Sequence, residues 1–314
     1  MPAVSVIVPA RDAEATLPRT LAGLGHQRVP GDFEIIVVDD RSRDATARIA
    51  RGAPLPLRLL GGDGSGPAAA RNLGAAAARA PALAFLDADC EPADGWLAAG
   101  LEALAAADLV QGAVAPPPDA TIGPYDRTLV VTRPYGLFET ANLFVRADLF
   151  ARLGGFESWL RPRRGIELGE DVWLGWRARR AGARTAFCDR ALVWHAVTPR
   201  AAPAYVAERA RLRLFPALAA RIPELRDGFF YRRWFHSRRS AAFDLAVAGA
   251  LAARGLRSPL PLAAAAPYAR LVVADARLWG RRRAPAIAAA QVAADAVGAA
   301  ALAWGSLRAR SLLL

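Results

Sequence analysis

Short apolar runs alternate with alanine-rich stretches through the first ninety residues of the chain. Apolar runs of strand length lie at residues 4–8, 34–38 and 82–86, with a further candidate strand at residues 57–60. Stretches of helical composition separate them at residues 13–24, 45–50 and 67–80. Strands and helices that alternate in this way predict an α/β fold, with a mainly parallel, Rossmann-like sheet that carries helices on both faces.

The later part of the chain changes in character twice. Residues 109–197 are less regular, apart from a predicted helix that carries Glu170 and Asp171. From about Arg209 onward the sequence consists of arginine clusters and alanine-rich stretches, which predict helices. We therefore expect a catalytic domain at residues 1–230 and a helical, alanine- and arginine-rich tail at residues 231–314.

The charge of the chain favours an anionic partner. All 41 basic residues are arginine, and the formal net charge is +12. A bias toward arginine codons would explain this usage, but the excess charge still favours a nucleotide, an acidic lipid surface or a nucleic acid. The two cysteines, Cys90 and Cys188, fit neither a disulfide framework nor a metal-site spacing, which indicates a reducing compartment. Residues 4–9 have the pattern of a buried strand and not of a signal peptide, so we expect a cytoplasmic protein.

Carboxylates gather where the predicted strands end. Asp39 and Asp40 follow the second strand, and Asp87 and Asp89 follow the run at residues 82–86. The carboxyl ends of parallel strands meet at one edge of a sheet, where like charges repel unless a cation is present. Oxygen ligands of this kind suit Mn²⁺ or Mg²⁺ held together with a substrate diphosphate. A solvated turn after a strand is the alternative interpretation of the Asp87–Asp89 triplet.

Three further groups are candidates for the same edge. Arg71, at the start of a helix, can bind phosphate or ribose, or it can be a surface arginine. Glu170 and Asp171 begin a helix, where one of them can accept the proton of an incoming hydroxyl group, although acidic residues are also common at helix starts. His195 follows an apolar run and is either a metal ligand or a structural histidine.

Seven short motifs, in this order, resemble family 2 glycosyltransferases of the GT-A fold. They are VSVIVPAR at residues 4–11, VVDDRS at 37–42, ARNLG at 70–74, FLDAD at 85–89, ANLFVR at 141–146, GGF at 154–156 and GED at 169–171. The resemblance spans about residues 3 to 197. It implies an inverting transfer of a sugar from a UDP-, GDP- or dTDP-sugar, usually with manganese or magnesium.

The resemblance also implies a role for each matching residue. Nucleotide contacts fall to Pro9, Ala10, Arg11, Asp39, Asp40, Arg71 and Asp87. Asp89 would be the stronger metal ligand, helped by Asp87 and, as in some members of the family, by His195. Asp171 would be the general base, with Glu170 as the alternative. Contacts to the sugar or to the acceptor are expected from Trp96, Asn142 and Gly155.

One departure from the family pattern bears on the product. The Gln-x-x-Arg-Trp motif of processive polysaccharide synthases does not occur in the sequence, and residues 209–213 occupy roughly that region without matching it. We therefore expect one sugar to be transferred in each event.

Two alanine-rich stretches in the tail, at residues 260–279 and 284–307, approach the length of about 20 residues that a membrane span requires. They contain polar residues that oppose insertion: Arg270, Asp275, Arg277, Gln291 and Asp295. Interfacial or bundled helices are therefore expected, with headgroup contacts from arginine clusters at residues 232–233, 238–239 and 281–283. A helical cap or a dimer surface is the alternative. A lipid-linked acceptor on an anionic membrane surface would explain such a tail.

Two other functions compete with this interpretation. A G-x-G-x-x-A pattern at residues 64–69, with Asp87 about twenty residues later, would suit an NAD(P)-binding oxidoreductase, but it leaves Asp89 and Asp171 without a role. A non-catalytic basic protein that binds membrane or nucleic acid would explain the arginine clusters. However, the acidic positions are all filled, and no aromatic residues interleave the arginines as a nucleic-acid stacking surface requires, so we expect no nucleic-acid partner.

Overall fold

The protein is described by a computed structural model that covers residues 1–160 and 168–314. Within it the chain forms two compact units. Unit 1 consists of residues 1–120 and 128–197, and unit 2 consists of residues 121–127 and 198–314. These units are defined by packing alone, so the expected division into a catalytic domain at residues 1–230 and a tail at 231–314 stays a prediction.

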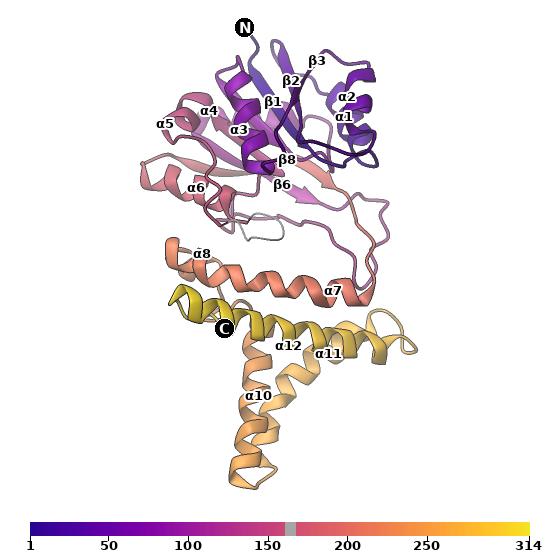
Figure 1. Ribbon diagram of the computed structural model, residues 1–314, viewed down its shortest axis with the longest axis vertical. Coiled ribbons are helices and arrows are strands. Elements are labelled where there is room, and N and C mark those ends of the chain that lie inside the picture. The colour runs from indigo at the N-terminus through magenta and orange to yellow at the C-terminus, as the bar shows by residue number, and fades with distance from the viewer. Residues whose placement is uncertain (161–167) are drawn as a thin grey trace. The chain divides into compact units, whose positions relative to one another are not determined.

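Unit 1 is built on one eight-stranded sheet (Figure 1) with the strand order β3-β2-β1-β4-β7-β6-β8-β5. The strands are β1 Val4–Ala10, β2 Phe33–Asp39, β3 Leu57–Gly61, β4 Ala82–Leu86, β5 Cys90–Pro92, β6 Leu109–Ala115, β7 Asn142–Arg146 and β8 Thr185–His195. The strands β1 to β4 pair in parallel, as the alternation of strands and helices predicts. In the second half, β7 runs antiparallel to both β4 and β6, so the sheet is mixed.

The helices of unit 1 cover both faces of the sheet because the central strands are apolar on both sides. They are α1 Leu17–Gly25, α2 Thr46–Gly52, α3 Pro67–Ala77, α4 Trp96–Ala106, α5 Ala147–Arg152 and α6 Glu170–Arg180. On β1, Val6 and Val8 belong to the core beneath α1, α2 and α4, whereas Ile7 belongs to the core beneath α3, α5 and α6. This alternation follows from the two-residue period of a strand.

A glycine allows α3 to lie close to the sheet. A Cβ atom at Gly74 would lie 2.5 Å from Cγ2 of Ile7, so only glycine permits this separation of helix and strand. The start of the same helix is thereby held over the carboxyl ends of β1 and β4, which places Arg71 at that edge.

A buried asparagine joins the strands of the second half of the sheet. The side chain of Asn142 is fully buried, and its Nδ2 donates to the carbonyl oxygens of Ala113 and Ala191 at 2.8 and 2.7 Å. Its Oδ1 accepts a hydrogen bond of 2.8 Å from Nε1 of Trp96, which is also fully buried. One amide thus ties β6, β7 and β8 to the start of α4.

Unit 2 is helical, as the composition of the tail predicts. It contains α7 Ala202–Glu208, a 3₁₀ helix η1 Arg209–Leu214, α8 Phe215–Arg221, α9 Leu225–Gly228, α10 Arg238–Leu256, a second 3₁₀ helix η2 Leu260–Ala265, α11 Ala266–Arg277 and α12 Ala284–Ala309. The helix α12 packs against α7, η1, α8 and α11. Its buried residues recur every three or four positions, from Ile287 through Ala294 to Leu302, so one face of the helix lies in the core of this unit.

An arginine in unit 2 pairs with the polar residues of the alanine-rich helices. Arg239 on α10 donates from Nε to Asp295 at 2.8 Å, from Nη1 to Asp275 at 2.6 Å and from Nη2 to Gln291 at 3.3 Å. The hydroxyl of Tyr268 donates to the same oxygen of Asp295 at 2.8 Å. The guanidinium of Arg239 is therefore committed inside the bundle and is not available for the expected contact with a lipid headgroup.

By length and apolar composition, α12 could cross a membrane, and it is the one helix of the described residues that meets this test. Its packed face and the pairing of Gln291 and Asp295 with Arg239 describe a bundle helix. This arrangement is the bundled alternative among those that the sequence allowed.

Replacing Asn142 by alanine should destabilise unit 1. The substitution removes three buried hydrogen bonds and leaves two carbonyl oxygens and the indole Nε1 without a partner, so the free energy of unfolding should fall by roughly 3 kcal/mol. Urea unfolding followed by circular dichroism measures the change. A loss below about 1 kcal/mol would show that water replaces the amide without cost.

Candidate active site

The loops that follow β1 and β2 are bound to one another at the carboxyl edge of the sheet. The backbone N–H of Asp12 donates to Oγ of Ser42 at 3.0 Å, and Oδ1 of Asp12 accepts from the N–H of Arg43 at 2.7 Å. The N–H of Ala13 donates to Oγ1 of Thr46 at 2.8 Å. These reciprocal bonds hold both loops in place beside the positions where Ala10 pairs with Asp39 in the sheet.

Asp40 is buried and holds the glycine-rich loop after β3. Its two carboxylate oxygens accept hydrogen bonds of 2.8 and 2.9 Å from the backbone N–H groups of Gly64 and Gly66. Nη1 of Arg11 lies 3.8 Å from the same carboxylate. In a dinucleotide-binding loop such N–H groups would face a diphosphate. Here Asp40 takes that place, which argues against the oxidoreductase alternative.

Arg71 bonds Glu170, which lies 99 residues later in the chain, and also Asp87. The residue is 5% exposed, and its Nη2 lies 2.6 Å from Oδ1 of Asp87 while its Nη1 lies 3.2 Å from Oε1 of Glu170. The guanidinium also lies over the ring of Phe156, at 5.8 Å. Burial lowers the pKa of Arg71, but the charges of Asp87 and Glu170 raise it by more, so the group is cationic.

Asp171 is half-buried beside this network, in an acidic environment. It occupies the first turn of α6 next to Glu170, and its Oδ1 accepts a hydrogen bond of 2.7 Å from the N–H of Val172. Burial raises the pKa of Asp171 well above its usual value, and the charges of Glu170 and Glu139 raise it further. Burial also raises the pKa of Glu139. Among the residues that the structure describes, Asp171 forms no ion pair with an arginine, whereas Glu170 is paired with Arg71. The raised pKa therefore makes Asp171 the better proton acceptor of the two.

Asp89 and His195 come together where the β5 and β8 strands pair. Nε2 of His195 lies 3.5 Å from Oδ2 of Asp89, and Cys90 pairs directly with His195 in the sheet. Nδ1 of His195 lies 2.8 Å from the carbonyl oxygen of Ala196, so this nitrogen carries the proton in neutral imidazole and Nε2 has a free lone pair. Thr128 donates to the carbonyl oxygen of His195 at 3.1 Å and steadies the strand end.

The thiol of Cys90 completes a group of three possible ligands, whose nearest atoms all lie within 4.8 Å of one another. Burial and the charges of Asp89 and Asp87 raise the pKa of Cys90 well above its usual value. A protonated thiol is a poor metal ligand. The useful donors are therefore one carboxylate oxygen and one imidazole nitrogen, a set that Mn²⁺ or Mg²⁺ accepts together with phosphate oxygens.

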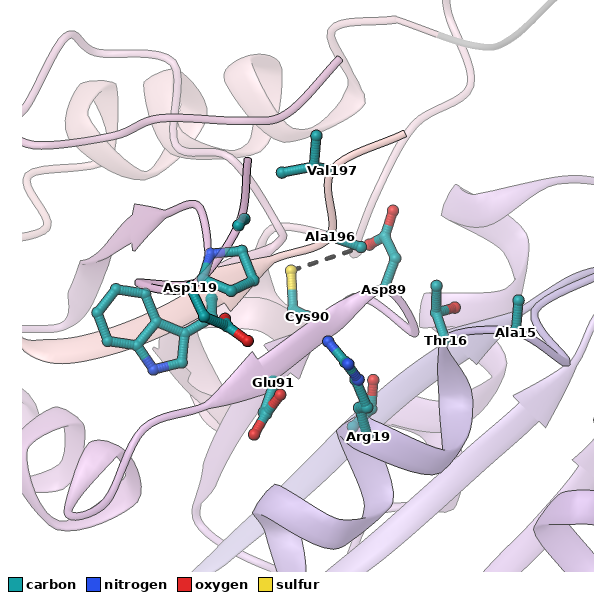
Figure 2. Close-up of a pocket in the computed structure, with 13 residues that line it drawn as sticks. Ala15, Thr16, Arg19, Asp89, Cys90, Glu91, Asp119, Ala196 and Val197 are labelled. Atoms are coloured by element: carbon teal, nitrogen blue, oxygen red, sulfur yellow. Dashed lines mark hydrogen bonds between the residues drawn. The ribbon is translucent and has the colours of Figure 1, made fainter. Parts of the chain in front are cut away.

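A pocket of about 400 Å³ adjoins these residues. Figure 2 shows Arg19 extending into it from α1, beside Thr16, with Asp89 and Cys90 across the space. It is large enough for a small ligand. The remaining wall comes from residues of four segments: Ala15, Thr20, Glu91, Pro117, Asp119, Ala120, Trp194, Ala196 and Val197.

Three residues expected to contact a sugar or the acceptor lie elsewhere. Trp96 and Asn142 are fully buried and hydrogen-bonded to each other, which speaks against direct contact with a sugar. Gly155 is also buried, has a φ of +72°, and would place a Cβ 2.6 Å from Oδ1 of Asn72. Asn72 in turn makes two hydrogen bonds of 2.9 Å to the backbone of Phe156. Trp96 and Asn142 therefore stabilise the sheet, and Gly155 shapes the turn before Phe156, whose ring lies beside Arg71.

Three residues at the site were not predicted from the sequence. Glu139 acts on Asp171, Thr128 contacts His195, and Cys90 adjoins Asp89. Cys90 follows the Asp87–Asp89 triplet directly, which is a signal that could have been used. Glu139 and Thr128 lie outside the helices and strands, so no periodic pattern in the sequence indicates that their side chains face the site.

The chain is similar to known glycosyltransferases in sequence. Residues 5–157 match the family model Glycosyl transferase family 2. Glycosyltransferase AglE of Haloferax volcanii is 30% identical over 214 residues, which are 63% of this chain and 68% of that protein. The pre-mycofactocin glycosyltransferase of Mycobacterium tuberculosis is 31% identical over 210 residues. The match covers 61% of this chain and 42% of the mycobacterial protein, so the chain spans less than half of that relative's length.

A solved structure extends the similarity to the fold. The mannosyltransferase PcManGT from Pyrobaculum calidifontis, in complex with GDP-Man and Mn²⁺, has a TM-score of 0.57 at 23% identity. The match covers 95% of this chain and 87% of that one. It confirms the predicted α/β fold of the GT-A type with a helical C-terminal region.

Removing the charge of Arg71 should destabilise the protein strongly. Arg71→Met removes a buried cation that Glu170 and Asp87 share, so the free energy of unfolding should fall by roughly 3 kcal/mol, measured by urea unfolding. In the double variant with Glu170→Leu the two losses should be far from additive, because no buried charge is left unpaired.

The control is Arg152→Met, which breaks the ion pair with Asp148 in which both side chains are more than half exposed. It should change the stability by less than about 1 kcal/mol. Equal effects of the two single variants would contradict the central role of Arg71.

Proposed function

Because this chain belongs to glycosyltransferase family 2 and is a glycosyltransferase, we propose that it transfers a single sugar from a nucleoside-diphosphate sugar to a hydroxyl group of its acceptor, with inversion and with a divalent cation. The donor nucleotide is UDP, GDP or dTDP. The observation that carries this proposal is the buried Arg71, which bonds Asp87 on one side and the first turn of the helix bearing Asp171 on the other. The guanidinium of Arg71 thereby connects Asp87, on the side of the leaving diphosphate, with the helix that carries the proposed proton acceptor Asp171.

Asp89 and His195 would hold the divalent cation. The fit rests on the carboxylate and imidazole that lie 3.5 Å apart, with Nε2 left free by the contact of Nδ1 with Ala196. When bound, Mn²⁺ or Mg²⁺ neutralises the charge that develops on the departing diphosphate. Asp87, the first residue of the triplet, keeps its contact with Arg71 and supports the same edge.

Asp171 is the general base of the proposed reaction. The acceptor oxygen attacks the anomeric carbon as the bond from that carbon to the diphosphate oxygen breaks, and the carboxylate of Asp171 takes the hydroxyl proton. The products are the glycoside, the nucleoside diphosphate and protonated Asp171. A single displacement of this kind inverts the anomeric configuration. Glu170 is the weaker candidate because its carboxylate already neutralises Arg71.

The nucleotide would lie along the edge formed by the ends of β1 and β2. Pro9 and Ala10 end β1, and Arg11 follows it. Asp39 ends β2 opposite Ala10, and the N–H of Asp40 donates to the carbonyl oxygen of Ala10 at 2.8 Å. Nε of Arg71 is buried and has no hydrogen-bond partner among the described residues, so it is a donor that a phosphate or ribose oxygen could satisfy.

The acceptor is proposed to be lipid-linked, with the enzyme at the cytoplasmic face of a membrane. The net charge of +12 supports this location, because the cytoplasmic leaflet of a membrane is rich in anionic lipids. The exposed arginines at residues 281–283 support it as well.

Replacing Asp171 by asparagine should abolish most of the activity without harming the fold. We expect nucleoside diphosphate release from a panel of UDP-, GDP- and dTDP-sugars with Mn²⁺ to fall by about 10²–10⁴-fold. The free energy of unfolding at neutral pH should not fall, because a carboxylate whose pKa is raised in the folded state destabilises that state when ionised. Retained activity in Asp171→Asn, together with its loss in a folded Glu170→Gln, would make Glu170 the base.

In the same assay, the activity of the protein should increase with pH. A base must be deprotonated, so kcat/KM should rise with pH and level off above the raised pKa of Asp171. Glu139→Gln removes a neighbouring negative charge and should move this limb to lower pH. A shift in the opposite direction would exclude Asp171 as the titrating base.

Replacing Asp89 by alanine should separate metal-dependent from metal-independent nucleotide binding. Calorimetric titration of the protein with UDP, GDP and dTDP should show one nucleotide whose affinity Mn²⁺ increases. In Asp89→Ala that increase should fall by at least about tenfold, and His195→Ala should act in the same direction.

The matched control is Asp94→Ala, which removes an exposed carboxylate five residues away. Its Mn²⁺-dependent affinity should equal that of the unchanged protein. If Asp89→Ala also keeps that affinity, the cation lies elsewhere.

A further inference from the structure

The end of the α10 helix and the η2 helix that follows it expose large apolar side chains. We call residues 245–262 the apolar tip. Its exposed members are between 42% and 81% accessible: Leu245, Val247, Leu251, Leu256, Leu260 and Leu262. Single exposed leucines are ordinary on protein surfaces, but six large apolar side chains exposed within eighteen residues indicate an interaction site.

The exposed residues of α10 point in opposite directions. At 100° per residue, Leu256 lies on the same side of the helix as Leu245, whereas Val247 and Leu251 lie about 200–240° away. A protein that docks on one face of a helix would cover one of these sides and leave the other in water. An apolar medium that surrounds the helix end would cover both.

The positive charge of the apolar tip and the residues after it indicates which apolar medium would surround it. Residues 245–274 contain no aspartate or glutamate, and their three arginines, Arg254, Arg257 and Arg270, are exposed. Long arginine side chains can keep their charge at a phosphate while their stems cover apolar surface. Anionic phospholipid headgroups above acyl chains provide both environments.

The leucines are exposed although the backbone around them is held firmly. A Cβ atom at Gly249 would lie 2.5 Å from the carbonyl oxygen of Pro261, so α10 and η2 are in close contact. Tyr268 and Val272 on α11 pack with Ala242 on α10 in a small core, and Arg239 ties the base of the hairpin to α12. Figure 1 shows that the connection between α10 and α11 lies at the end of the hairpin away from α12. The apolar tip is thus presented by a rigid support.

We propose that the apolar tip inserts into the interfacial region of an anionic phospholipid bilayer. The leucines would reach the boundary of the acyl chains, roughly 5–10 Å deep, with Arg254 and Arg257 at the phosphates. The α12 helix stays outside the bilayer, because one of its faces is packed within unit 2. This inference builds on the proposed membrane location but not on the proposed transfer reaction, and it can be tested without turnover.

The test is flotation of the full chain with two kinds of vesicles, phosphatidylcholine alone and phosphatidylcholine mixed with phosphatidylglycerol. The unchanged protein should bind the anionic vesicles more tightly. The triple variant Leu251→Glu, Leu256→Glu, Leu260→Glu should lose at least about tenfold in partitioning, since each leucine contributes transfer free energy and each new charge opposes insertion. Arg254→Ser and Arg257→Ser should each cost about fivefold on anionic vesicles only.

The matched control is Leu307→Glu, which places the same charge at a leucine of α12 that is 77% exposed. It should partition like the unchanged protein, and thermal unfolding should show that every variant is folded. Equal losses in the control and the triple variant would overturn the assignment to the apolar tip.

Other outcomes separate this inference from the membrane proposal. If the unchanged protein does not float with either kind of vesicle, both ideas fail. If it floats and the triple variant floats equally well, only the apolar tip is excluded. If the triple variant instead turns a dimer into a monomer with unchanged flotation, a second copy of the chain covers the tip and the inference is wrong.

A fluorescent label provides an independent measure that does not depend on the loss of binding. Both native cysteines are buried, so Ala252→Cys in the tip can be labelled selectively with an environment-sensitive dye. Its emission should shift to shorter wavelength with anionic vesicles, whereas a label at Ala300→Cys on α12 should not shift. A shift at position 300 alone would point to α12 and contradict the proposal.

Discussion

The buried ion pairs of Arg71 are the constraint on which the site depends. A guanidinium that is almost excluded from water is stable only when its charge is balanced, and here Asp87 and Glu170 balance it from two distant segments. Gly74 makes this possible because α3 can then approach the sheet. Asn72 and the turn at Gly155 fix the opposite wall.

This arrangement gives neighbouring acidic groups of the site different electrostatic surroundings. Glu170 is paired with Arg71, whereas Asp171 forms no ion pair within the described part of the chain. It lies close enough to Glu139 and Glu170 for their charges to raise its pKa. Two adjacent carboxylates thus acquire different proton affinities from their surroundings alone. The same separation appears in the triplet, where Asp87 faces Arg71 and Asp89 faces His195.

In unit 2, as at Arg71, one arginine balances the charges of acidic residues from separate helices. The polar residues that make its alanine-rich helices poor membrane spans are joined by Arg239 and Tyr268. With those charges paired in the bundle, some apolar side chains remain exposed on α11 and α12, such as Val273 and Leu307, and six are exposed in the apolar tip. A bilayer contact there would require no helix to leave the bundle.

The strands β1 to β4, the helices between them and the gathering of carboxylates at one edge were predictable from the sequence, because strand and helix periods and the residues that follow each strand are local properties. The ordered motifs identified the family, whereas the roles assigned to Asp89, Asp171 and Arg71 stay predictions. The tertiary structure was needed to show that β7 runs antiparallel between β4 and β6, and that Trp96 and Asn142 face the core and not a sugar. It alone brought Glu139 to Asp171 and Arg239 to Asp295, since pairs separated by tens of residues leave no periodic trace along the chain.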